Sequence, residues 1–264
     1  MRSLTWIGIG GAMVLAWLAG GCVPTVDLSK QLDEGFGALQ QKNYPAAFSA
    51  ADGVLAQKPP TTTAATAHYL KGRAIEERTK PDDATVSADL QLAREQYVRA
   101  LELKPPQPLE ANLRAQVANV AYFQDDYATA ISQWGTAYAD LPDAESQAWA
   151  LYRIGVSQQR QGLWDSADRT YARVIEKHPG SVPAQRAKDR TGARAFYVQI
   201  GAFKEVTGAE RTLNDVRLLG VAPVKSIDPR GLHVVRAGPF TAYTTAKATR
   251  QRLIGKFSDA TIVP

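Results

Sequence analysis

The stretch Phe196-Tyr197-Val198-Gln199-Ile200-Gly201-Ala202-Phe203 decides how the end of this chain folds. Its first positions alternate between the two faces expected of a half-buried strand. The segment Val235–Phe240 (Val-Arg-Ala-Gly-Pro-Phe) has the same ending, a glycine followed two positions later by phenylalanine. We therefore expect two related strands, with Gly201 and Gly238 at their ends and with Phe203 and Phe240 in the core.

The residues around these two strands predict a compact α+β unit. The expected elements are strands over 196–203, 224–227, 232–237 and 260–263, a turn over 228–231, and helices over 208–219 and from Thr241 to Leu253. Leu213, Val216 and Leu219 recur at helical spacing, and Gly220 ends that helix. The order βαββαβ predicts a four-stranded antiparallel sheet with both helices on one face. The other face would stay open.

Side-chain alternation predicts which residues line that open face. The residues expected to point away from the helices are Tyr197, Gln199, Val234 and Arg236, and those expected to point inward are Val198, Ile200, Val235 and Ala237. An aromatic ring, an amide and a guanidinium would then share one surface. Sugars are commonly bound in this way, with their rings against aromatic side chains and their hydroxyl and acetamido groups hydrogen-bonded to amides.

The two motifs and this order of elements resemble the SPOR domain, a bacterial module that binds peptidoglycan glycan strands. The resemblance covers residues 195–264 and implies that Gln199 and Arg236 bind glycan, with Tyr197 beside them. SPOR domains prefer glycan that has lost its stem peptides, and such glycan exposes lactyl carboxylates. Without the resemblance, an arginine or glutamine on an open sheet is better explained as a solvated surface residue.

The charge distribution agrees with an anionic ligand. Residues 195–264 contain ten Lys/Arg and five Asp/Glu, so this unit carries the whole formal net charge of +5. Arg236 can pair with a carboxylate through two parallel hydrogen bonds. The same topology occurs in RNA-binding modules, but their aromatic-rich signature is missing here, and secretion would separate the domain from RNA. We expect no nucleic-acid partner.

The sequence between Leu28 and Gly180 repeats itself. Four prolines close successive helical patterns: Pro59, Pro105, Pro142 and Pro179. Each is preceded by a small residue (Gly35, Gly72, Ala118, Gly155) and by a large residue with an alanine three positions later (Tyr44/Ala47, Leu90/Ala93, Tyr127/Ala130, Trp164/Ala167). This pattern resembles the tetratricopeptide repeat, a pair of antiparallel helices with small residues where they touch. We expect about four repeats.

Three of the repeats have the same spacing, and the second is longer. The small residue and the closing proline are 24 positions apart in three repeats and 33 apart in the second. We place the extra residues in a loop at Thr79–Ala84. The concave face of the array could hold a partner peptide, while Trp134, Trp149 and Trp164 are expected to fill contacts between helices. Residues 181–193 are expected to cap the array as a basic helix.

The N-terminus predicts secretion and lipid anchoring. Arg2 precedes an apolar run over 4–21, as in a secretory signal, and Leu18-Ala19-Gly20-Gly21-Cys22 resembles a bacterial lipobox. One departure is that the leucine lies four residues before Cys22 rather than three, so signal cleavage without acylation is the alternative. By resemblance to sorted lipoproteins, Val23 after the cysteine favours the outer membrane.

These patterns divide the chain into five parts. They are a signal peptide over 1–21, a lipidated linker over 22–27, repeats over 28–180, a capping helix and linker over 181–194, and the SPOR-like domain over 195–264.

No catalytic or metal-binding pattern emerges from the sequence. His68, His178 and His233 are far apart, and no phosphate loop, nucleophile elbow or HExxH motif occurs. We expect His178 to interact as a cation with the end of its helix. The acidic pairs Asp82-Asp83 and Asp125-Asp126 are expected to be solvated in turns. We therefore expect no enzyme activity, no cofactor and no metal.

The sequence thus predicts a lipid-anchored envelope protein that faces the periplasm, binds denuded peptidoglycan and recruits an unidentified protein partner through its repeats, at the division septum. The alternative is a repeat lipoprotein that serves as a scaffold for outer-membrane or secretion assembly, with the SPOR-like domain as a passive tether. A wall-cleaving enzyme is disfavoured because no catalytic residues are evident.

Overall fold

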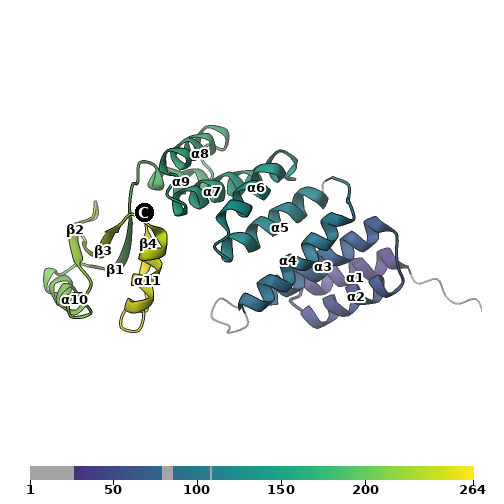
Figure 1. The fold of residues 1–264 in the computed structure, drawn as a ribbon, viewed down its shortest axis with the longest axis horizontal. Helices are drawn as coiled ribbons and strands as arrows, with labels where there is room; N and C mark the ends of the chain where they lie inside the picture. The colour runs from purple at the N-terminus through teal and green to yellow at the C-terminus, as the bar shows by residue number, and fades with distance from the viewer. Residues whose placement is uncertain (1–26, 79–85, 108) are drawn as a thin grey trace, which may run out of the picture.

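The computed structural model describes residues 27–78, 86–107 and 109–264. Figure 1 shows an array of helices that leads into a small domain of sheet and helices. The predicted signal sequence and Cys22 lie outside the described residues, as do Asp82 and Asp83.

Helices pair along the array as the repeats predict. The pairs are α1 (Leu28–Gln40) with α2 (Tyr44–Ala56), α3 (Thr61–Arg78) with α4 (Val86–Glu102), α5 (Leu109–Phe123) with α6 (Tyr127–Ala137), and α7 (Ala144–Arg160) with α8 (Trp164–Lys177). A short 3₁₀ turn, η1 (Tyr138–Asp140), follows α6, and α9 (Val182–Arg190) packs on α7 and α8 as the predicted cap. The side chains of Asn43, Asp126 and Asp143 accept backbone N–H groups at the first turns of α2, α6 and α7.

Small residues lie where the paired helices approach most closely, as predicted. A Cβ placed on Gly72 would be 2.4 Å from Cε1 of Tyr97, and one on Gly155 would be 2.4 Å from Cε1 of Tyr171. Both tyrosine side chains are fully buried. The glycines therefore make room for a tyrosine from the partner helix.

The additional residues of the second repeat are not confined to a loop, which corrects the prediction. Helix α4 contains 17 residues, whereas its counterpart α2 contains 13. Part of the insertion therefore lengthens a helix. The segment 79–84, where the loop was predicted, lies outside the described residues.

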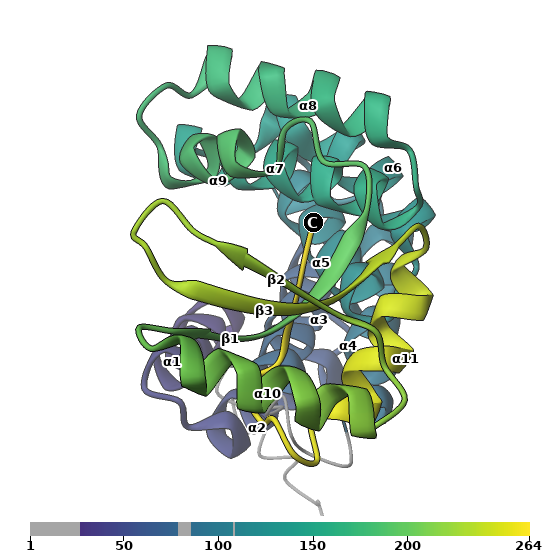
Figure 2. The same ribbon diagram turned by 90° about the vertical axis from the view of Figure 1, so that its left-hand side faces the viewer.

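The C-terminal domain has the predicted βαββαβ order. Its elements are β1 (Phe196–Phe203), α10 (Val206–Leu218), β2 (Pro223–Ile227), β3 (His233–Phe240), α11 (Tyr243–Leu253) and β4 (Thr261–Val263). The strands pair in the order β2-β3-β1-β4, and each neighbouring pair is antiparallel. Figure 2 shows α10 and α11 on the same face of this sheet. The core between them includes Val198, Val216, Val235 and Leu253.

The two glycines lie inside strands rather than at strand ends, which corrects another prediction. A Cβ on Gly201 would be 2.7 Å from Cζ of Phe203, and one on Gly238 would be 3.1 Å from Cδ1 of Tyr197. Gly238 also has a φ of 126°, which disfavours other residues. Both glycines therefore make room for an aromatic ring on the sheet. Phe203 and Phe240 are only partly buried and flank the core.

A partly buried arginine joins the C-terminal domain to the array. The guanidinium of Arg160, at the end of α7, lies 4.5 Å from the ring centroid of Tyr122 and 4.4 Å from that of Tyr243 on α11. Its Nη1 also donates a hydrogen bond to the Tyr127 hydroxyl at 3.2 Å. Burial alone would lower the pKa of Arg160, but the surrounding tyrosines raise it. The charged guanidinium is thus held between aromatic rings of both domains.

Two further contacts connect the array to the C-terminal domain. Together with the contacts of Arg160 they form an interface that we call the joint. Trp164, at the start of α8, packs on Phe196 of β1 with ring centroids 4.9 Å apart. Lys247 of α11 forms an ion pair with Asp125 in the turn before α6. Trp164 therefore packs against the C-terminal domain rather than only within its repeat, which the sequence analysis did not predict.

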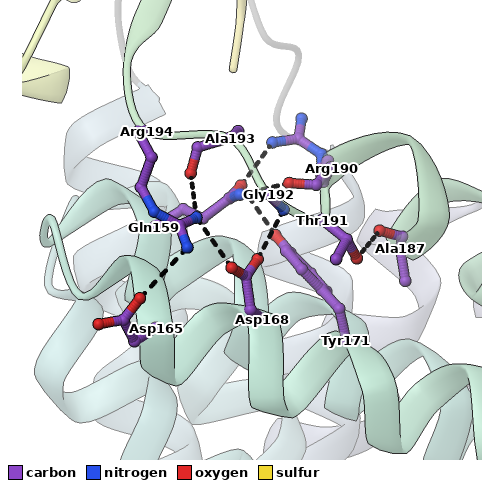
Figure 3. A network of polar contacts seen from close by, with 10 residues as sticks. All are labelled: Gln159, Asp165, Asp168, Tyr171, Ala187, Arg190, Thr191, Gly192, Ala193 and Arg194. Atoms are coloured by element: carbon purple, nitrogen blue, oxygen red, sulfur yellow. Dashed lines mark hydrogen bonds and ion pairs between the residues drawn. The ribbon is translucent and has the colours of Figure 1, made fainter.

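The linker between the two domains is also tied down, as Figure 3 shows. Arg194 forms ion pairs with Asp165 and Asp168 of α8, at 3.2 and 2.8 Å. The backbone N–H of Gly192 donates to Asp168 at 2.9 Å. The buried side chain of Gln159 donates to the carbonyl oxygen of Arg190 at 3.0 Å. The linker therefore follows the surface of α8 before entering β1.

Candidate functional site

The open face of the sheet carries a glutamine and an arginine that are bonded to each other. Gln199 of β1 lies directly opposite Arg236 of β3 in the register of the two strands. The Gln199 Oε1 accepts hydrogen bonds from both Nε and Nη2 of Arg236, each at 3.3 Å. Both side chains are partly exposed. We call this pair the sheet pair.

Tyr197 lies on the same face, next to the sheet pair. It is two residues before Gln199 on β1 and is partly exposed. Its ring lies against Gly238 of β3, where an added Cβ would be in tight contact with it. The last array helices, α8 and α9, lie towards this side of the sheet in Figure 2, but they leave Tyr197, Gln199 and Arg236 partly exposed. An aromatic ring, an amide and a guanidinium therefore share one accessible surface.

Val234 was predicted to be outward-facing, and it is only 2% exposed. It is not part of the apolar cluster between the sheet and the helices. Strand β3 is central and pairs with β1 and β2 on its two sides, so neighbouring side chains can cover a short valine. Alternation predicts the face of a residue, and its neighbours decide its exposure.

The charge of the sheet pair is not neutralised by the protein. Within the described part of the chain, Arg236 forms no ion pair. Some cations of the domain have acidic partners, such as Lys225 with Glu210 and Arg230 with Asp228, whereas others, such as Arg217 and Arg252, bond only to neutral oxygens. A guanidinium has five N–H groups, and Gln199 uses only two of those on Arg236. The remaining N–H groups of Arg236 can bind an anion.

The helices α3, α4, α7 and α9 carry a second set of polar and aromatic groups. Arg153 of α7 lies 6.0 Å from the ring centroid of Trp149, and Arg186 of α9 lies 5.1 Å from it. Glu76 of α3 accepts a hydrogen bond from the Tyr97 hydroxyl at 2.7 Å. Burial raises the pKa of Glu76 above its ordinary value, although this bond opposes the shift. Of the three tryptophans of the repeat array, only Trp134 is fully buried, while Trp149 and Trp164 are partly exposed.

The histidines lie on separate elements. His68 is on α3, where its Nδ1 is 2.9 Å from Gln96 Oε1, His178 follows α8, and His233 begins β3. Burial, aided by Lys177, lowers the pKa of His178, which therefore favours the neutral form and not the predicted cation. No three metal-ligating side chains gather among the described residues.

The acidic pair before α6 is bonded, not simply solvated as predicted. Asp126 caps α6 and pairs with Arg94 at 3.0 Å, while Asp125 pairs with Lys247.

Within the described residues, none of the helices has the length and apolar content needed to cross a membrane.

The sequence analysis missed the residues of the joint. It gave no role to Arg160 or Tyr243 and placed Asp125 only in a solvated turn, because their contacts join positions far apart in the chain. The aspartate–lysine contact spans 122 residues. No local spacing or periodicity signals such a contact.

Two family matches fall on the two parts of the fold. The SPOR domain family matches residues 192–264, and the tetratricopeptide repeat family matches residues 149–181. A solved structure described as the crystal structure of YrrB, a TPR protein with an unusual peptide-binding site, is similar at a TM-score of 0.47 and 18% identity, over 62% of this chain and 77% of that chain. The search of curated proteins finds no match.

The two family matches carry functional implications of different kinds. A SPOR domain implies peptidoglycan binding and a location in the cell envelope, and tetratricopeptide repeats imply interaction with proteins. Both matched families are binding modules, and no catalytic family is found. The chain is therefore a tetratricopeptide-repeat protein with a C-terminal SPOR domain.

Proposed function

We propose that this chain is a non-enzymatic, lipid-anchored protein of the outer membrane that faces the periplasm. Its SPOR domain binds glycan strands stripped of their stem peptides, and its repeats recruit a protein partner to that glycan at the division septum. The observation that carries the proposal is the sheet pair: a guanidinium without an acidic partner, positioned by an amide on an accessible sheet face.

The chemistry of denuded glycan supports this assignment. Each lactyl carboxylate can accept the remaining N–H groups of Arg236, and bonds between a guanidinium and a carboxylate are about twice as strong as neutral ones. Gln199 can bond to hydroxyl and acetamido groups while it holds the guanidinium in place. The Tyr197 ring offers a surface on which a sugar ring can stack. The net charge of the domain adds a general attraction for a repeating anion.

Co-sedimentation with purified sacculi tests the binding site. We expect Gln199→Ala and Arg236→Ala each to reduce the bound fraction of the chain at least fivefold. Treating the sacculi with an amidase, which removes stem peptides, should increase binding of the unmodified chain. Arg217→Ala is the matched control, because it also removes one positive charge but lies on α10, away from the open face. If all three variants bind sacculi as well as the unmodified chain does, the site lies elsewhere.

The lipid anchor requires its own test, because Cys22 lies outside the described residues. We expect metabolic labelling with a fatty acid to mark the unmodified chain and to leave Cys22→Ser unlabelled. Membrane fractionation should then place the unmodified chain in the outer membrane. A labelled Cys22→Ser variant would contradict the proposal.

The recruiting role rests on the repeats and is separable from glycan binding. We expect deletion of residues 28–180 to remove the partner from pulldowns while sacculus binding persists. In the alternative function, a scaffold for outer-membrane or secretion assembly with a passive SPOR tether, Arg236→Ala would leave septal localisation and assembly unchanged. Imaging a fluorescent fusion of this variant distinguishes the two functions.

A further inference from the structure

A cavity adjoins the sheet pair at the place where β4 begins. It has a volume of about 580 Å³ and is lined by the β1 segment from Gln199 to Phe203, by Thr212 of α10, by Thr261, and by the loop Lys256–Asp259. This volume is in the range of small-ligand sites. Gln199 belongs both to the sheet pair and to the cavity wall, so the two are adjacent. We call it the edge cavity.

The backbone of β1 is unpaired along this cavity. Strand β4 pairs only with Tyr197, Val198 and Gln199, and none of the described strands pairs with Ile200–Phe203 on that side. Because successive residues of a strand point their N–H and C=O groups to opposite edges, roughly half of the groups of Ile200–Phe203 point to the cavity side. A ligand there would meet both donors and acceptors of the main chain.

The side chains around the edge cavity suit a sugar acid. Lys256 pairs with Asp215 at 3.0 Å, but both side chains are substantially exposed, at 49% and 40%. Exposed pairs of this kind contribute about 0–1 kcal/mol, so the lysine can exchange its partner for a ligand carboxylate. Ser258 and Thr261 can bond to hydroxyl groups, and Phe203 contributes an apolar surface beside Gly201.

We propose that the edge cavity is a second saccharide subsite, in which Lys256 pairs with a lactyl carboxylate of the same glycan strand that occupies the sheet pair. The inference rests on the proposed function, since it extends the path of that glycan beyond Gln199. A saccharide is favoured over a peptide because the cavity shares Gln199 with the sheet pair and its unpaired strand edge is only four residues long.

The test measures the affinity of the full chain for amidase-trimmed glycan strands of defined lengths. We expect Lys256→Ala to weaken binding of long strands about tenfold, the effect of losing one charge-assisted hydrogen bond, and to leave the shortest bound strands unaffected. Asp215→Ala is the matched control: it breaks the same ion pair but keeps the lysine, so its affinity should stay within twofold of the unmodified chain. Equal weakening by both variants would overturn the proposal.

Gln199→Ala separates failure of this inference from failure of the proposed function. If Gln199→Ala weakens binding and Lys256→Ala does not, the edge cavity is no subsite and the sheet pair still binds glycan. If neither variant weakens binding, the proposed function fails as well.

Hydrogen exchange provides a second readout that does not depend on variants. Trimmed long strands should slow exchange of the amides in Ile200–Phe203, and short strands should not. Absence of slowing with long strands would overturn the proposal. Stronger slowing by untrimmed than by trimmed strands would also overturn it, because the cavity would then bind stem peptide.

Discussion

Replacing Gly155 with alanine tests the close helix packing on which the array depends. The added Cβ would lie 2.4 Å from Cε1 and 2.7 Å from Cδ1 of Tyr171, well inside contact distance. The tyrosine cannot easily move away, because it is fully buried and its hydroxyl donates to Gln159 Oε1 at 2.9 Å. Gln159 in turn bonds to Arg190 at the linker, so a shift would disturb the path into the SPOR domain.

Two opposing effects determine the size of the change. Overpacking of a core typically costs about 1–3 kcal/mol, while replacing a helical glycine by alanine contributes up to about 1 kcal/mol in the favourable direction. Since Tyr171 is held in place, we expect a net loss of about 1–2 kcal/mol. For a chain of this size, such a loss lowers Tm by roughly 3–6 °C. Thermal and urea unfolding followed by circular dichroism measure both quantities.

Gly135→Ala is the matched control. Gly135 lies on an exposed face of α6, and no atom outside its own helix neighbourhood is within 4 Å of a Cβ placed there. This variant should therefore be more stable than the unmodified chain by about 0.5–1 kcal/mol. If both variants raise Tm by the same amount, the helices do not approach as closely as described, and the reasoning is refuted.

Three other predictions concern the joint and the sheet. Arg160→Met should loosen the SPOR domain from the array, seen as a larger radius of gyration in small-angle scattering with unchanged helix content; an unchanged scattering profile would show that the guanidinium is dispensable. Burial alone would raise the pKa of Asp125, but hydrogen bonds from Lys247 and Tyr127 lower it below its ordinary 3.8. The stabilising contribution of the Asp125 carboxylate is therefore present above pH 3.8 and is lost as pH falls through the lowered pKa. Asp125→Asn should be less stable than the unmodified chain at neutral pH and equally stable in strong acid. A difference in unfolding free energy that stays constant across this pH range would argue against the ion pair. Asp228→Ala should speed amide exchange at Leu232, because the Asp228 carboxylate accepts that N–H at 3.0 Å; unchanged exchange would exclude this role.

Local patterns were sufficient for the order of elements. Helix pairs follow from the recurrence of small and large residues, and the βαββαβ order follows from alternation, helical spacing and the turn over 228–231. Each of these signals involves residues close in sequence. The same is true of the face assigned to Gln199 and Arg236, which alternation placed on one side of the sheet and which the structure brings into contact.

Predictions failed where distant neighbours decide the outcome. The exposure of Val234 depends on the side chains of the flanking strands, and Gly238 lies within β3, where a Cβ would be 3.1 Å from Cδ1 of Tyr197 on β1. The edge cavity exists because β4 is shorter than β1, which depends on how the two strands pair.

The sequence by itself therefore determined the repeat array, the order and faces of the C-terminal sheet, and the location of the basic charge, because these depend on residue spacing and composition. Only the tertiary structure decided that Arg160 lies between tyrosines of both domains, that the linker is held on α8, and that Gln199 orients Arg236. Such contacts join side chains that are many residues apart, and their formation depends on packing in three dimensions rather than on any local preference of the chain.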